Sequence, residues 1–206
     1  MQNTTTLLGR FLLFILAFGV SIVSMRYWSF ETIDILTMKT PEVLTNKIYQ
    51  ASFYSHVIFG PVALITGPFQ FLPKLRIKYL FAHRIIGKIY VVACLLSGVA
   101  GLAAAQWTLG GPLTKLGFSL LAVYWLFTTT KAFLTIRKKE VLAHKQWMIR
   151  SYALTLSAVT LRMYLPLLQG GFGLTFLASY QIVGWLCWMP NLLVAEWWIR
   201  NKLSVK

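Results

Sequence analysis

The sequence predicts an all-α integral membrane protein, a bundle of six transmembrane helices that forms a single domain over residues 1–206. Hydrophobic residues make up 57% of the chain and charged residues only 12%, about half the charged share of a soluble domain. Residues 49–73, 89–114 and 163–195 contain no Asp, Glu, Lys or Arg. About 20 apolar residues suffice to cross the hydrocarbon core as a helix. The apolar residues are consecutive rather than alternating, which argues against a β-barrel.

Turn signals and basic residues divide the chain into its expected helices. The first ends at Arg26 and lacks the small-residue cleavage pattern of a signal peptide. The Thr-Pro-Glu sequence at residues 40–42 predicts a helix start that leads into the second, with Thr40 as the cap. Glycines at 110–111 end the third, and glycines at 170–171 separate the last two. The expected ranges are about 7–27, 52–72, 85–107, 116–136, 145–168 and 174–198.

Basic residues gather in alternate connections and predict the topology. They lie between the second and third helices, between the fourth and fifth, and in the tail: Lys74, Arg76, Lys78, Arg84, Arg137, Lys138, Lys139, Lys145, Arg200, Lys202 and Lys206. Because such residues favour the cytoplasmic side, both termini are expected there, in a multi-pass protein of the bacterial cytoplasmic membrane. The net charge of +15 then reflects contact with the lipid bilayer. No basic stripe interleaved with aromatic residues points to nucleic acid.

Polar and small residues form stripes on three of the expected helices. At 100° per residue, the fifth helix places His144 and Arg162 on one face, 18 residues and about 27 Å apart. That face also carries Met148, Ser151, Thr155 and Ala158. One face of the third helix carries His83, Gly87, Tyr90, Cys94, Ser97, Gly101 and Ala105. One face of the second helix carries His56, Gly60, Ala63, Gly67 and Gln70. Ionisable groups at membrane depth often mark function, but small residues also allow close helix packing. Both interpretations remain open.

The histidines define two candidate sites. His83 and His144 fall at the cytoplasmic ends of their helices and would be the axial ligands of a haem iron. Gly87, one turn after His83, would leave room for a porphyrin, and Arg84 and Lys145 would balance its propionates. The second candidate is a polar site near the external surface, formed by His56, Gly60 and Arg162. A zinc site is less favoured, because acidic ligands are nearly absent.

Several motifs give the chain a family resemblance. The segments GPFQFLPKLR, HRIIGKIYV, HKQWMIRSYALTLSAVTLR and WMPNLLVAEW resemble a bacterial family of predicted membrane proteins of unknown function, over about residues 54–198. The architecture is also similar to six-helix cytochrome b-type electron carriers. Those use histidines on helices two and four for an external haem, and on helices three and five for a cytoplasmic one. His56, His83 and His144 match three of these positions, but the fourth helix has no histidine. The likeness therefore implies one cytoplasmic haem b.

Three functions follow as hypotheses. The leading one is a redox protein with one b-type haem between the third and fifth helices, exchanging electrons with quinone or another membrane redox partner. The alternative is a transporter of a small molecule or of protons along the stripe from His144 to Arg162. The third is an accessory or assembly subunit whose stripes pack against partner helices. Whether the chain is an enzyme stays open.

Overall fold

The computed structural model is all-helical, which confirms the predicted fold class, and it describes residues 4–203 apart from the side chains of residues 4–8 and 10. Lys206 of the predicted basic tail lies outside the described residues. The α-helices are α1 (Thr4–Ser24), α2 (Pro41–Thr45), α3 (Lys47–Gln70), α4 (Pro73–Lys78), α5 (Leu80–Ala104), α6 (Gly111–Arg137), α7 (Val141–Thr155), α8 (Ser157–Pro166), α9 (Phe176–Leu186) and α10 (Met189–Lys202). Short 3₁₀ turns follow α1 and α5, and a π-helical turn, Leu167–Gly171, follows α8.

Five helical stretches in the described part of the chain are long and apolar enough to cross a membrane. They are Phe11–Ser29, Lys47–Gln70, Leu80–Trp107, Gly111–Arg137 and Phe176–Lys202. Large apolar side chains such as Ile22, Val99 and Leu193 are exposed on their outer faces, as lipid contact requires. The membrane class is therefore supported by structure as well as composition. The sixth crossing and the orientation of the termini stay predictions.

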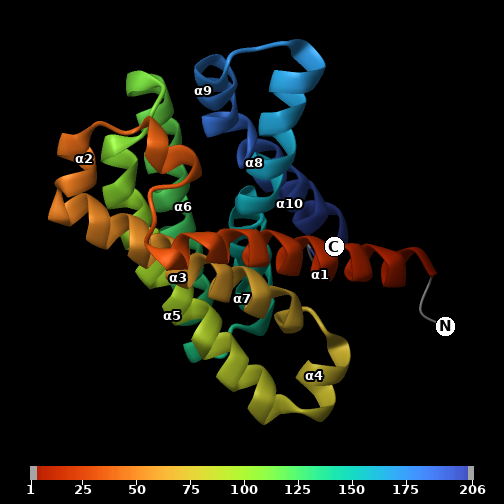
Figure 1. Ribbon diagram of the computed structural model, residues 1–206. Coiled ribbons are helices and arrows are strands. Elements are labelled where there is room, and N and C mark those ends of the chain that lie inside the picture. The colour runs from red at the N-terminus through yellow and green to blue at the C-terminus, as the bar shows by residue number, and fades with distance from the viewer. Residues whose placement is uncertain (1–3, 204–206) are drawn as a thin grey trace.

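Helix α5 packs between α3 and α6 (Figure 1). α5 contacts α3 along one side and α6 along another, and α6 in turn packs against α7 and α9. α1 lies beside α3 and also contacts α8, while its N-terminal end projects beyond the other helices. The faces that meet at α5 are the striped faces, since Tyr90, Cys94 and Ser97 are all almost completely buried.

Two helices begin earlier than expected. The predicted 52–72 helix starts at Lys47, because the Asn46 side chain caps it by accepting hydrogen bonds from the Ile48 and Tyr49 amides at 2.9 and 3.1 Å. The short helix α2 does begin at the Thr-Pro-Glu sequence, but the Thr40 side chain makes no capping bond. The predicted 85–107 helix starts at Leu80, so that His83 lies within its first turn.

Prolines inside α3 leave two backbone carbonyls without their helical partners. Both carbonyls accept from aromatic side chains of other elements. The Trp28 indole nitrogen donates to the Val57 carbonyl, one turn before Pro61, at 3.0 Å. The Tyr152 hydroxyl donates to the Leu64 carbonyl, one turn before Pro68, at 3.3 Å. The prolines thus link α3 to its neighbours.

The two last predicted helices are each broken into two, which corrects the unbroken ranges 145–168 and 174–198. The first breaks at Leu156 into α7 and α8, where the Thr155 and Ser157 hydroxyls donate to the backbone carbonyls of Ser151 and Leu154; such bonds compete with the helical ladder. The second breaks at residues 187–188 into α9 and α10, just before Pro190, which cannot donate to the ladder.

Candidate functional site

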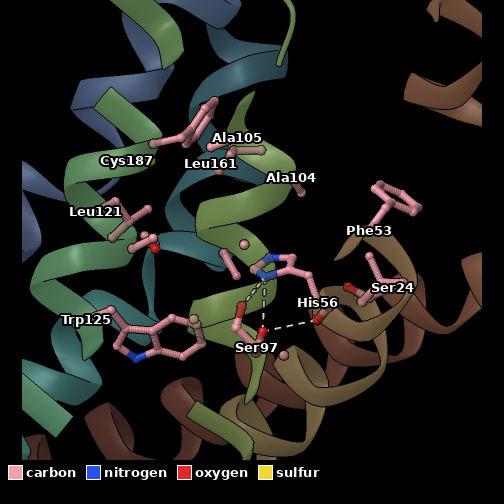
Figure 2. Close-up of a pocket in the computed structure, with 18 of the residues that line it drawn as sticks. Ser24, Phe53, His56, Ser97, Ala104, Ala105, Leu121, Trp125, Leu161 and Cys187 are labelled. Atoms are coloured by element: carbon pink, nitrogen blue, oxygen red, sulfur yellow. Dashed lines mark hydrogen bonds between the residues drawn. The ribbon is translucent and has the colours of Figure 1, made fainter. Parts of the chain in front are cut away.

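A cavity of about 260 Å³ lies within the bundle, among α3, α5, α6 and α8. Most of its wall is apolar, with Phe53, Leu121, Trp125 and Leu161 among the lining residues drawn in Figure 2. Several polar side chains interrupt this wall. They include Ser24, Lys39, His56, Ser97, Thr155 and Arg162.

His56 is fixed by Ser97 of the facing helix (Figure 2). Its Nδ1 lies 2.9 Å from the Ser97 carbonyl oxygen, and the Ser97 hydroxyl donates to the His56 carbonyl at 3.1 Å. Because a carbonyl can only accept, Nδ1 carries the proton and Nε2 is left as an acceptor in the neutral ring. The ring lies so close to Gly101 that a Cβ there would stand 2.8 Å from Nδ1. Helix α5 therefore needs glycine at this position.

Arg162 supplies a positive charge to the same cavity. Its Nη1 donates to the Ala158 carbonyl at 3.0 Å and its Nη2 to the Ser24 hydroxyl at 2.9 Å. Both acceptors are neutral. The ion pairs found in residues 4–203 join other partners: Arg26 with Asp34, and Arg150 with Glu196. The half-buried guanidinium thus has spare donors and no carboxylate beside it.

Lys39 adds a second cation from the segment before α2. Its ammonium group donates to the Trp107 carbonyl and lies 5.8 Å from the centre of the Tyr49 ring. Burial lowers the pKa of Lys39 from the ordinary value of 10.5. The charge on this lysine is consequently easier to remove than that of a solvated one.

At the predicted haem site, His83 of α5 and His144 of α7 lie close enough to affect each other electrostatically. The His144 Nδ1 donates to the Ala132 carbonyl at 2.7 Å, which orients the ring and leaves Nε2 free to ligate. The His83 Nδ1 is buried and has no hydrogen-bond partner in the described structure. A bound group or an ordered water would satisfy such an atom.

Gly87 does not face open space. A Cβ at this position would stand 3.0 Å from the Gln70 side-chain oxygen, so the carboxamide of α3 fills the place expected for a porphyrin edge. The Gln70 nitrogen is itself buried without a partner. Arg84 and Lys145 are exposed, and Arg84 lies close enough to His83 to affect it electrostatically.

A layer of hydroxyl groups separates the two sites. The Tyr90 hydroxyl lies 2.8 Å from the Ser151 hydroxyl and 3.0 Å from that of Thr155. Thr129 bonds Ser151 at 2.7 Å, and the Trp125 indole donates to Thr155 at 2.9 Å. These bonds tie α5, α6 and α7 together at the middle of the striped faces.

The structure thus brings the predicted residues into two groups. His56, Gly60 and Arg162 all line the cavity, and His83 and His144 lie near each other. Sequence reasoning missed Ser24 and Lys39, which come from outside the striped faces and carried no signal of their own. No cluster of three or more His, Cys, Asp or Glu occurs among residues 4–203. Away from both groups, Arg150 forms an ion pair with Glu196, with Nη2 2.9 Å from Oε2.

The apolar helices, with a largely apolar cavity between them, define an integral membrane protein. The family comparison agrees with this class. The chain belongs to the family described as "Predicted membrane protein (DUF2306)", whose model matches residues 53–199. This confirms the resemblance carried by the motifs. No curated protein and no solved structure matches the chain.

Proposed function

We propose that this protein binds a small lipid-soluble molecule inside the membrane, in the cavity lined by His56 and Arg162, and carries it as a transporter does. The observation that supports this most is the combination of space and polar groups at one place. Ligand sites are typically apolar cavities with a few fixed polar groups. The cavity has this composition, and Ser97 holds His56 in a single orientation.

The size of the cavity limits the ligand. A cavity of about 150 Å³ accepts benzene, so about 260 Å³ has room for a substituted ring or a polar head with a short chain. A quinone head falls within this range. Breaks in α7–α8 and α9–α10 next to the cavity support transport, because interrupted helices often surround transporter sites.

The proposed topology retains six crossings. Helices α7 and α8 are separated by a single residue and would together form the sixth membrane crossing. Along the chain, this crossing would lie between those at Gly111–Arg137 and Phe176–Lys202. An even number of crossings puts both termini on one side. The basic connections then favour the cytoplasm, in the cytoplasmic membrane.

Filling the cavity tests the binding proposal. Ala122 lines the cavity, whereas its neighbour Val123 is 47% exposed on the outside of α6. We expect Ala122→Leu to abolish binding of six-carbon amphiphiles, such as 1-hexanol and hexanoate, to protein in phosphatidylcholine nanodiscs. Val123→Leu should leave that binding unchanged. Calorimetric titration measures both. Unchanged binding in Ala122→Leu, or no binding to the natural sequence, would overturn the proposal.

A second candidate function is electron transfer through one b-type haem held by His83 and His144. Two observations favour it: the free Nε2 of His144, whose Nδ1 bonds a carbonyl, and the unpartnered Nδ1 of His83. Haem would supply one-electron chemistry, with Arg84 and Lys145 near the propionates and a quinone as one redox partner. The Gln70 side chain would have to leave Gly87 for the ring to enter.

A reduced-minus-oxidised absorption spectrum tests this candidate. Purified protein with added haem should show sharp α and Soret bands. His83→Ala and His144→Ala should each abolish them, while His56→Ala, which changes the other site, should retain them. A flat spectrum for the natural sequence would exclude haem binding and leave the cavity as the functional site.

A further inference from the structure

We infer that the cavity recognises a negatively charged head, a carboxylate or a phosphate, and that Arg162 is the residue that binds it. This inference rests on the proposed binding function and specifies its ligand class. The basis is a charge imbalance at the cavity wall. Arg162 and Lys39 both line it, and none of the chain's five acidic residues does. Those are Glu31, Asp34, Glu42, Glu140 and Glu196.

An unpaired guanidinium inside a membrane bundle is energetically costly. Buried charges are usually paired, and Arg150 follows this rule by bonding Glu196 through two nitrogens. In the part of the chain that the structure describes, the half-buried Arg162 instead bonds the neutral oxygens of Ser24 and Ala158. A guanidinium has five N–H donors, so donors remain for a ligand. An anion would compensate the charge that the chain leaves uncompensated.

The rest of the wall agrees with an anionic amphiphile. The His56 Nε2 would accept a hydrogen bond from a hydroxyl on the head, and Lys39 adds positive potential. The aromatic and aliphatic residues of the wall, including Phe53, Leu121 and Trp125, would contact an apolar chain or ring. A cationic ligand would meet two positive charges and no carboxylate.

Three probes that share a six-carbon chain and differ in the charge and chemistry of the head test the inference: hexanoate, 1-hexanol and hexylamine. In phosphatidylcholine nanodiscs we expect hexanoate to bind about tenfold or more tightly than hexanol, since one charge-assisted hydrogen bond contributes this much. Arg162→Gln should remove that difference and leave hexanol binding unchanged, which also shows that the variant is folded. Arg162→Lys should retain part of it. Arg200→Gln, which removes an exposed charge from α10, is the matched control.

Each outcome decides a different point. Equal affinity for hexanoate and hexanol, or hexanoate binding that Arg162→Gln leaves intact, would overturn the inference while the binding function stands. Failure of all three probes would overturn the proposed function itself. Two further arms identify the source of the anion. Acetate that binds as tightly as hexanoate would indicate a free anion, and competition by phosphatidylglycerol in the nanodisc would indicate a lipid headgroup; either result supports an anion site.

Discussion

The cavity at His56 and the pair of His83 and His144 are built on the same striped helices, but in the described part of the chain a cavity of about 260 Å³ adjoins His56 and is not lined by either member of the pair. At the cavity, glycine at position 101 lets the His56 ring lie against α5, and open volume remains beside it. At the predicted haem site, the glycine at position 87 is covered by Gln70. Two glycines on the striped face of α5 therefore have different roles: Gly101 makes room for a histidine of another helix, and Gly87 makes room for a glutamine.

This difference explains why polar stripes alone do not locate a binding site. A stripe shows which face of a helix is buried, and small residues on it allow helices to approach. Whether a void remains depends on the side chain that the neighbouring helix brings to that level. Tyr152 and Gln70 fill such places at Gly67 and Gly87. No comparable side chain fills the cavity beside His56.

The largest effect is expected from comparing two glycines of α3. A Cβ at Gly67 would overlap the ring of Tyr152, whereas one at Gly60 would stand at an ordinary 3.4 Å from the Ser97 hydroxyl. Gly67→Ala should lower the free energy of unfolding by about 1–3 kcal/mol through overpacking. Gly60→Ala should be neutral or stabilising by up to ~1 kcal/mol. Denaturant unfolding in detergent measures both, and equal effects would show that the two regions are packed alike.

A smaller effect is expected for the hydroxyl layer between the two regions. Tyr90→Phe removes the contacts to Ser151 and Thr155, but both partners keep other hydrogen bonds. Hydrogen bonds in membrane bundles contribute about 0.6 kcal/mol on average and at most about 1.7. We therefore expect a loss near 1 kcal/mol in the same unfolding measurement. Tyr124→Phe, on the exposed side of α6, is the control, and an equal loss there would refute the assigned role of the layer.

The fold class and the buried faces were predictable, because both follow from composition and helical periodicity. Tyr90, Ser97 and Ser151 lie on predicted stripes and are fully buried. Helix starts were less predictable, since Asn46 rather than Thr40 supplies the capping oxygen. The break at Leu156 accompanies side chains that bond backbone carbonyls, and the second break lies just before Pro190; hydrophobic periodicity contains neither signal.

The members of the candidate site that lie on the striped helices could be grouped from the sequence, but those from other segments could not. His56, Gly60 and Arg162 were grouped by their expected depth, and all three line the cavity. The contributions of Ser24 and Lys39 depend on how α1 and the segment before α2 pack against the bundle. That arrangement is set by contacts between distant residues, such as the Trp28 indole with the Val57 carbonyl. A helical wheel contains no information about such contacts.

The smallest expected effect concerns pH and the second cation of the cavity. Burial lowers the pKa of Lys39 below 10.5. As the pH rises, Lys39 therefore loses its positive charge at a lower pH than a solvated lysine does, and the cavity wall then carries one positive charge fewer. Hexanoate affinity should then fall by about two- to fivefold, the contribution of a partly screened charge pair, while hexanol affinity stays constant. Titrations from neutral pH to above the ordinary lysine value of 10.5 measure this. Lys39→Arg keeps its charge over that range and should abolish the decline, because arginine does not lose its proton there. A decline that persists in Lys39→Arg would assign the pH dependence to another group and leave Arg162 as the sole cation recognising the head.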